Sequence, residues 1–218
     1  MKVLITGAWG IVGRETVPEF LEAGYEVCAF DMAGKRQMAT ARRVIRKLSP
    51  PVRQKLHVIW GSLTDIADVS RAVTGVDAVI HLGAIIPPLA DHQPERAAMV
   101  NVGGTEVLVR ILERINSACK LIFTSSIAIW GDRRARPLIL PTDQPSPESR
   151  DVYARQKLEA ESVVRACNLP WSILRLTYIV SPDKLAMDPL LIEMPLDTPI
   201  EICHARDVAL ALRHAVER

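Results

Sequence analysis

The chain opens with the stretch Lys2-Val3-Leu4-Ile5-Thr6-Gly7-Ala8-Trp9-Gly10-Ile11-Val12-Gly13. Its apolar start predicts a β-strand over residues 2–6, and the amphipathic pattern that follows predicts a helix over residues 11–23. Gly7 permits a tight turn, Gly10 lets the backbone approach a pyrophosphate, and Gly13 lets the helix pack closely on the strand. The N–H groups at the start of the helix would face the phosphates. The spacing therefore predicts a dinucleotide-binding loop at the start of the chain.

Short β-rich runs alternate with longer amphipathic segments along the rest of the chain, which is typical of βαβ units and a parallel sheet. We expect strands at residues 2–6, 26–30, 56–60, 78–82, 121–125 and 171–176. We expect helices at residues 11–23, 34–48, 66–73, 94–115 and 151–167. Two Pro-rich stretches, residues 133–150 and 181–199, predict loops beyond the carboxyl ends of the fifth and sixth strands. The pattern predicts an α/β fold with a Rossmann-type, doubly wound parallel sheet.

The composition suits one sizeable core, because 49% of the 218 residues are hydrophobic and 24% are charged. A net charge of +2 provides no long-range field for nucleic acid or an anionic membrane. No apolar run reaches the roughly 18 residues that a membrane span needs, and the first residues lack a signal-peptide pattern. We therefore expect a soluble, cytoplasmic protein that binds neither nucleic acid nor membrane. The cysteines form no C-x-x-C pair, so we expect buried thiols rather than a metal site or a disulfide.

Asp31 stands at the end of the second predicted strand, roughly 20 residues after the glycine loop. A carboxylate at this position can accept hydrogen bonds from the hydroxyls of the adenosine ribose. The 2′-phosphate of NADP would meet like charge there, and Met32 follows where an arginine would be wanted. These residues favour NAD, although Lys35 and Arg36 are near enough to keep NADP open.

Tyr153 and Lys157 lie four residues apart on a predicted helix, so the phenol and the ammonium share one face. A free tyrosine has a pKa near ~10 and acts as a general acid or base at neutral pH only if a cation stabilises the phenolate. Lys157 can supply that charge, and it can also hold the ribose of a nicotinamide. The alternative is an ordinary contact on a surface helix.

The buried strand before this helix ends in the hydroxyl residues Thr124, Ser125 and Ser126. A hydroxyl at the carboxyl end of a central strand can donate to a substrate carbonyl or alkoxide beside the tyrosine. Ser126 is the preferred candidate, with Ser125 or Thr124 as the alternatives. No G-x-S-x-G elbow or nearby His and acid pattern supports a nucleophilic serine.

Several motifs together resemble the extended short-chain dehydrogenase/reductase superfamily, specifically its NAD-dependent epimerase/dehydratase family, over nearly the whole chain. In chain order they are the glycine loop Thr6–Gly13, His81-Leu-Gly-Ala84, Asn101-Val-Gly-Gly-Thr105, Ser125-Ser126 with Trp130-Gly131, Tyr153 with Lys157, and Ala205-Arg-Asp207. The resemblance implies a catalytic triad of Ser126, Tyr153 and Lys157. It also implies that Asn101 supports the active-site helix. For His81 we favour a core or strand-end histidine whose hydrogen bonds are satisfied.

The resemblance also implies a set of contacts to the cofactor NAD and no metal ion. These contacts are Gly7, Ala8, Trp9, Gly10, Ile11, Val12, Gly13, Asp31, Ser62, Leu63, Leu82, Gly83, Ala84, Asn101, Thr124, Tyr153 and Lys157. Two of the positions depart from the family pattern. Ser62 stands where an aspartate usually recognises adenine, and Trp130 replaces the usual tyrosine before glycine. Adenine contacts would then come from Leu63 and from backbone groups.

About 60 residues follow the catalytic lysine, fewer than the family normally uses to grip a nucleotide-linked substrate. We expect residues 1–176 to form the NAD-binding domain and residues 177–218 a reduced C-terminal substrate-binding part that is not an independent domain. Either the protein is a compact member with a small substrate, or the chain lacks segments of the native protein.

The motifs predict an NAD-dependent oxidoreductase or epimerase that moves a hydride between nicotinamide and a hydroxyl-bearing carbon. The substrate would be a sugar, a sugar nucleotide or a small hydroxy or keto compound, and the sequence does not choose among epimerisation, dehydration, oxidation and reduction. A non-enzymatic protein that senses NAD(P) is the alternative. The apolar residues of the helices at 94–115 and 151–167 exceed one sheet-facing stripe, which predicts a homodimer.

Overall fold

The strand predicted at the start of the chain lies in the middle of the sheet. The computed structural model of this chain describes residues 1–140, 142–181, 195 and 200–218. Six parallel strands follow the order β3-β2-β1-β4-β5-β6. The chain order therefore reverses between β1 and β4, and ligands of open α/β sheets bind at such a switch point, beyond the carboxyl ends of the strands. The predicted Rossmann-type sheet is confirmed.

The strands match the predicted ones closely. They are β1 (Lys2–Thr6), β2 (Glu26–Asp31), β3 (Leu56–Trp60), β4 (Ala78–His81), β5 (Lys120–Ser126) and β6 (Trp171–Leu176), with a separate parallel pair, β7 (Tyr178–Val180) and β8 (Ile202–His204). The helices are α1 (Gly13–Glu22), α2 (Lys35–Lys47), α3 (Pro50–Arg53), α4 (Ile66–Ala72), α5 (Leu89–His92), α6 (Pro94–Ala98), α7 (Gly104–Ile115), α8 (Val152–Ala166) and α11 (Ala205–Glu217). A π-helical turn, η1 (Met99–Gly103), precedes α7, and a 3₁₀ turn, η2 (Ile127–Trp130), follows β5.

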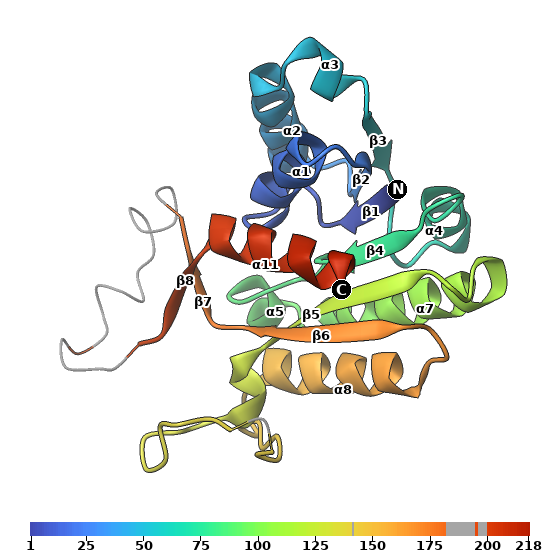
Figure 1. The fold of residues 1–218 in the computed structure, drawn as a ribbon. Helices are drawn as coiled ribbons and strands as arrows, with labels where there is room; N and C mark the ends of the chain where they lie inside the picture. Colours follow the sequence, from blue (N-terminus) through green and yellow to red (C-terminus); the bar gives the residue numbers. More distant parts are fainter. Residues whose placement is uncertain (141, 182–194, 196–199) are drawn as a thin grey trace.

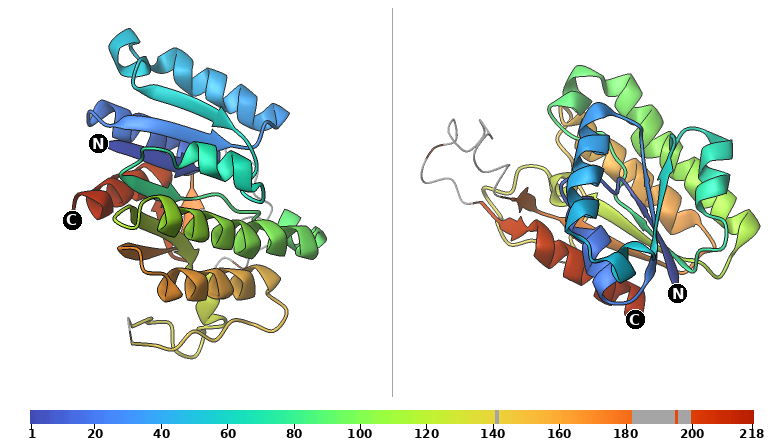
Figure 2. Two further views of the ribbon diagram at one scale, coloured as in Figure 1. Left: turned by 90° about the vertical axis from the view of Figure 1, so that its right-hand side faces the viewer. Right: turned by 90° about the horizontal axis from the view of Figure 1, so that it is seen from above.

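Helices cover both faces of the sheet, as the two views of Figure 2 show. The face toward α4, α7 and α8 carries side chains such as Leu4, Val79 and Leu121, while the face toward α1, α2 and α11 carries Val3 and Ile122. Neighbouring residues of a strand point to opposite faces, so a strand that is buried on both sides must be apolar throughout. Each continuous apolar run of the sequence therefore contributes side chains to two separate cores, one on each face of the sheet.

The helix predicted over residues 94–115 is interrupted in the structure by η1. This correction matters for the site, because Asn101 lies in that turn. Residues 133–140 and 142–150 contain neither helix nor strand, as expected for a loop. Most of the loop predicted at residues 181–199 lies outside the described residues.

The C-terminal helix α11 packs across the sheet beside α1 (Figure 1). Val208, Leu212 and Val216 bury their side chains in the core on that face. Ion pairs join the two helices, from Arg206 to Glu15 at 3.3 Å and from Arg213 to Glu19 at 2.9 Å. The thirteen residues of α11 are thus part of the same packed unit as the glycine loop.

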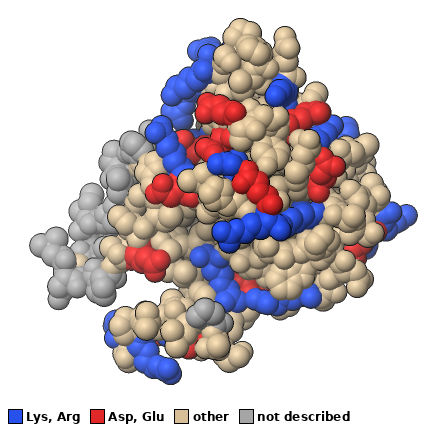
Figure 3. Space-filling model, in the orientation of Figure 1, with Lys and Arg blue, Asp and Glu red and all other residues tan. Residues whose placement is uncertain are grey.

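The surface mixes charges of both signs over the face drawn in Figure 3. In the part of the chain that the structure describes, no helix is both long enough and apolar enough to cross a bilayer. The four cysteines are free thiols, and two of them, Cys28 and Cys119, are buried. Burial raises the pKa of each of these two thiols above its ordinary value.

Candidate active site

The loop between β1 and α1 has the geometry that its three glycines predict. Gly7 has a φ of +64°, and a Cβ there would lie 2.8 Å from the Gly83 nitrogen, so only glycine fits between the two strand ends. A Cβ at Gly13 would lie 2.3 Å from the Gly7 oxygen, because α1 packs directly on the turn. At Gly10 a Cβ would meet only the Gly7 oxygen, at 3.3 Å, within 4 Å. The outer side of the loop is therefore open at Gly10.

Helix α1 starts immediately after this loop. Its N-cap residue, Val12, provides no side-chain hydrogen bond to the first turn. The N–H groups of Arg14 and Glu15 already donate to the carbonyls of Gly10 and Val12. Within the loop, the N–H groups of Ala8, Trp9 and Gly10 donate to the Phe30 carbonyl, the Asp31 carboxylate and the Gly7 carbonyl. The positive end of the helix dipole, at the end of the loop, suits a phosphate. We call the loop Gly7–Gly13 the cradle.

Asp31 ends β2 beside this cradle. Its two carboxylate oxygens accept backbone N–H groups, one from Trp9 and one from Met32, each at 2.8 Å. Burial raises the pKa of Asp31, and the two N–H groups oppose that effect. Each oxygen keeps a lone pair for a further donor, so the carboxylate can still accept a ribose hydroxyl.

The loops after β3 and β4 also meet at this edge of the sheet. Leu63, in the loop after β3, reaches across to the loop after β4: a Cβ at Gly83 would lie 2.6 Å from the Leu63 Cδ1 atom. The Ser62 hydroxyl instead bonds to the Thr64 hydroxyl at 2.8 Å. Leu82 packs against the core on the α1 side, and Ala84 is half-buried. The structure thus brings Leu63 and Gly83 together.

Lys157 joins α8 to the end of β5. Its ammonium donates to the Thr124 carbonyl at 2.8 Å and lies 5.0 Å from the centre of the Phe123 ring. The Tyr153 ring centre is 5.9 Å away on the same face of α8. The Lys157 side chain is 4% exposed. The predicted pair of phenol and ammonium is therefore close in space, and the ammonium is screened from water.

Burial shifts both members of this pair. It lowers the pKa of Lys157 to about 8, and Glu161 opposes that change. It raises the pKa of Tyr153 above its ordinary value, with a further contribution from Asp151. In the protein by itself these two effects favour the neutral phenol of Tyr153. The role of Lys157 in stabilising a phenolate stays a prediction.

Ser126 ends β5 and caps η2, its hydroxyl oxygen accepting the Ala128 N–H at 3.2 Å. It is half-buried, whereas Ser125 and Thr124 are 3% and 5% exposed. The Thr124 hydroxyl donates to the His81 carbonyl at 2.9 Å. Ser126 is therefore the hydroxyl of the three that a substrate can reach most easily, which supports its choice over the two alternatives.

His81 connects the glycine loop to the helices through two hydroxyls. Nδ1 is 2.7 Å from the Thr6 hydroxyl and Nε2 is 3.0 Å from the Thr105 hydroxyl. The Thr105 hydroxyl donates to the Asn101 carbonyl at 2.7 Å, so the Nε2–H tautomer completes the chain of hydrogen bonds. Burial lowers the pKa of His81 to about 3, with a smaller contribution from Lys157. The prediction of a core histidine with satisfied hydrogen bonds is confirmed.

Asn101 holds three segments together from the π-helical turn. Its amide accepts the Ile85 N–H at 2.7 Å and donates to the Ile85 carbonyl at 2.9 Å and to the Gln156 side chain at 2.9 Å. Gln156 in turn donates to the Pro94 carbonyl at 3.0 Å. Asn101 therefore fixes the helix that carries Tyr153 and Lys157. The motifs do not single out Gln156 or Thr105 as site residues, although both residues lie within them.

Fold and site define a Rossmann protein of the short-chain dehydrogenase/reductase type. The chain matches the NAD dependent epimerase/dehydratase family over residues 3–218, and it belongs to that family. It is 30% identical over 175 residues to the 3 beta-hydroxysteroid dehydrogenase/Delta 5→4-isomerase of Mycobacterium tuberculosis (strain ATCC 25618 / H37Rv), a match that covers 77% of this chain and 43% of that protein. It is 28% identical over 185 residues to the bifunctional UDP-glucose 4-epimerase and UDP-xylose 4-epimerase 3 of Arabidopsis thaliana, covering 81% and 51%.

A solved structure shows the same fold over the full length of this chain. The UDP-glucose 4-epimerase from Bifidobacterium longum, in complex with NAD⁺ and UDP, superposes with a TM-score of 0.80 at 21% identity. The match covers 100% of this chain and 74% of that one. The chain spans only about half the length of the curated relatives it matches. The family is NAD dependent, which agrees with the cofactor predicted from Asp31 and the glycine loop.

Proposed function

We propose that this chain is the NAD-binding and proton-transfer part of an epimerase or dehydrogenase. The substrate would carry a hydroxyl-bearing carbon in a sugar, a sugar nucleotide or a small hydroxy or keto compound. The observation that carries the proposal is the pair of half-buried Tyr153 and buried Lys157 at the carboxyl end of β5. A half-buried hydroxyl, that of Ser126, ends the same strand. A protein that only senses NAD(P) has no need of such a pair.

The residues of the cradle fit NAD. Gly10 leaves the loop open to a pyrophosphate, and Asp31 is held by two backbone N–H groups beside it. When bound, NAD supplies the hydride acceptor or donor and, in its oxidised form, a further positive charge. The backbone of Gly7–Gly13 would hold the phosphates and the Asp31 carboxylate the adenosine ribose. Lys157 would hold the nicotinamide ribose.

The reacting proton moves through residues of this chain. Tyr153 takes the proton of the substrate hydroxyl during oxidation and returns it during reduction. Lys157 favours the phenolate through its charge, and Ser126 donates a hydrogen bond to the substrate oxygen. Burial raises the pKa of Tyr153, so the phenolate needs further positive charge nearby. The oxidised cofactor would supply that charge when bound. The order of binding would then be cofactor first.

The test uses purified protein with NAD⁺ and a panel of UDP-glucose, UDP-xylose and a 3β-hydroxysteroid, following NADH formation and sugar epimerisation. Tyr153→Phe removes the proton acceptor and should reduce turnover on the order of a hundredfold or more, with NAD⁺ affinity nearly unchanged. Lys157→Ala should reduce both. Tyr25→Phe is the matched control, because Tyr25 donates to Glu217 on the surface.

Near-normal turnover in the Tyr153→Phe protein would overturn the proposed mechanism. Tight NAD⁺ binding with no turnover on any compound, in wild type and in Tyr25→Phe alike, would favour the sensing protein instead.

The predicted homodimer rests on fewer side chains than the sequence suggested. Leu108, Ile111, Leu112 and Val164 pack within the chain's own core. A homodimer stays a prediction.

A further inference from the structure

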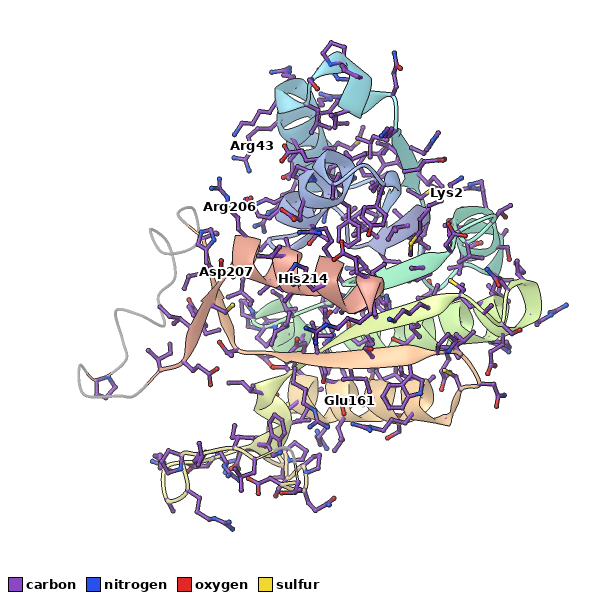
Figure 4. All side chains as sticks on the ribbon, viewed as in Figure 1. Lys2, Arg43, Glu161, Arg206, Asp207 and His214 are labelled. Atoms are coloured by element: carbon purple, nitrogen blue, oxygen red, sulfur yellow. The ribbon has the colours of Figure 1, made fainter. Side chains whose placement is uncertain are left out.

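A buried carboxylate lies one helical turn beyond the catalytic lysine. Glu161 follows Lys157 by four residues on α8 and is 1% exposed. Figure 4 shows it on α8 beside β6. Arg175 on β6 grips it with two hydrogen bonds, Nε to Oε1 at 2.9 Å and Nη2 to Oε2 at 2.8 Å. Arg165 adds a longer contact of 3.3 Å from a position nearer the solvent.

The same arginine reaches the turn that carries the serine. Its guanidinium lies over the Trp130 ring, 4.5 Å from the centre. Trp130 is the last residue of η2, and Ser126 is the residue that caps the other end of that turn. The Trp130 indole also donates to the Asp143 carbonyl at 3.4 Å. Arg175 therefore ties α8, β6 and η2 together at one point.

An ion pair that is buried to this extent contributes little to stability. Removing two charges from water costs about as much as their attraction returns, and apolar residues of similar size often serve the fold equally well. A role for the charge itself is the more economical reason for its presence at this position.

The groups around Lys157 show where that charge acts. From β5 the lysine faces the Thr124 carbonyl and the Phe123 ring, and from its own helix it faces Tyr153 and Glu161. His81 on β4 is neutral above pH 4, because burial lowers its pKa to about 3. Glu161 is the group that raises the pKa of Lys157 against the effect of burial.

Glu161 is itself kept charged by its partners. Burial raises its pKa, but the hydrogen bonds from Arg175 and Arg165 and the charge of Arg175 outweigh burial, so that the pKa lies below its ordinary value. The carboxylate is therefore a fixed negative charge at neutral pH. Its position relative to Lys157 is set by the helix, which places residues four apart on one face.

We propose that Glu161 is a positioning residue for Lys157: held by Arg175, it keeps the catalytic lysine in its ammonium form and fixes the Ser126 turn against the same helix. The inference rests on the proposed function, because the ammonium form matters only if Lys157 acts on Tyr153 and the cofactor. The ion pair of Glu161 on α8 and Arg175 on β6 would then support the pair of Tyr153 and Lys157 from behind.

The test measures the titration of Lys157 directly, by NMR of protein labelled with ¹³C at the lysine Cε atoms. The Lys157 signal is assigned by its loss in Lys157→Arg. In wild type we expect a midpoint near pH 8. In Glu161→Gln, which keeps the shape and one acceptor oxygen, the midpoint should fall by about one pH unit. Glu161→Asp should restore most of the shift.

Arg165→Gln is the matched control, because it changes the same ion-pair cluster but removes a positive charge instead of a negative one. In this variant the titration midpoint of Lys157 should equal that of wild type or lie above it. If Arg175 left without its partner prevents Glu161→Gln from folding, the double variant Glu161→Gln/Arg175→Met removes both charges and should still lower the midpoint. A Lys157 midpoint at or above that of wild type in Glu161→Gln, or in the double variant where Glu161→Gln does not fold, would overturn the inference.

The titration needs neither substrate nor cofactor, so its outcome is separate from that of the proposed function. NAD⁺ binding is measured by calorimetry on the same samples. A wild-type protein that does not bind NAD⁺ would contradict the proposed function, whatever the Lys157 midpoint. Normal NAD⁺ binding together with an unshifted midpoint in Glu161→Gln would contradict only the role of Glu161.

Discussion

Asp31 accepts two backbone N–H groups, from Trp9 in the glycine loop and from Met32 after the strand. The first bond ties the cradle for the phosphates to the carboxylate proposed to select the ribose. Because the side chain is already held, no ordering of Asp31 is needed when a ribose binds. The 2′-phosphate of NADP would instead bring negative charge against a carboxylate that cannot turn away without losing both bonds.

Asp31→Ala should reduce the affinity for NAD⁺ roughly tenfold or more, the effect of losing one or two charge-assisted hydrogen bonds. The affinity for NADP⁺ should fall less or rise, so the ratio of NAD⁺ affinity to NADP⁺ affinity should become smaller. Fluorescence titration of both cofactors measures the change. Asp77→Ala is a suitable control, because Asp77 accepts the Lys2 N–H at 2.7 Å at the opposite end of β1. An unchanged ratio of affinities in Asp31→Ala would exclude the carboxylate as the discriminating group.

The individual residues of the site differ in how far the sequence can predict them. Tyr153 and Lys157 share one helix, so the spacing of 3.6 residues per turn places them on one face. Glu161 has the same relation to Lys157, but its partner Arg175 lies on a strand fourteen residues away. Nothing in the pattern of β6 distinguishes an arginine that points to α8 from one that points to water. Pairs across elements depend on packing that local spacing does not encode.

At the level of elements, Gly10 and Gly13 have different tasks in the unit formed by β1, its loop and α1. A Cβ at Gly13 would collide with the Gly7 carbonyl at 2.3 Å, whereas a Cβ at Gly10 would meet that oxygen at 3.3 Å and nothing else within 4 Å. Gly10 therefore keeps open the space in which a ligand would lie. Gly13 allows the close contact between helix α1 and the turn.

Gly10→Ala should leave the thermal unfolding temperature close to that of wild type while NAD⁺ binding is weakened, because the added methyl group points into the cradle. Gly13→Ala should lower the unfolding temperature, since the helix must move off the turn, with a cost of about 1–3 kcal/mol. Calorimetric unfolding and NAD⁺ titration of both variants separate the two effects. Equal loss of stability in both variants would contradict the division of tasks.

The segment of residues 94–115 shows where prediction of elements fails. Its apolar periodicity predicts one helix, and the structure has α6, η1 and α7. The turn η1 places the Asn101 amide against Ile85 and Gln156. Gly104, directly after it, allows close packing, because a Cβ there would lie 2.9 Å from the Leu63 Cβ atom. Such turns are often found at functional sites, and their cause lies in partners far along the chain.

For the whole molecule, the sheet carries an apolar core on each face and a line of buried polar groups along its carboxyl edge. The line runs from Gly83 N–H to the Thr6 hydroxyl at 3.1 Å, then through His81 to Thr105 and Asn101. Each donor and acceptor has a partner only when His81 is neutral, because a protonated ring has no acceptor nitrogen for the Thr6 hydroxyl. The network therefore couples the fold to pH.

The folded pKa of His81 is about 3, and the unfolded value is near ~6.5. Between these two values the unfolded state binds one proton more, so stability falls as the pH drops through this window. This single group should reduce the free energy of unfolding by about 1.4 kcal/mol per pH unit below pH ~6. Above the unfolded pKa it should have no effect on the pH dependence.

His81→Gln should be less stable than wild type at pH 7, because the amide replaces the ring with poorer geometry, at a cost of about 1–3 kcal/mol. Its free energy of unfolding should then fall less steeply between pH 6 and pH 4, since the titrating group is gone. Urea unfolding at a series of pH values measures both slopes, and their difference removes the contribution of the carboxylates common to both proteins. His214→Gln, the same substitution at an exposed position of α11, is the matched control. Equal slopes for wild type and His81→Gln would mean that His81 already takes up a proton in the folded state, and the buried line of hydrogen bonds would have to be revised.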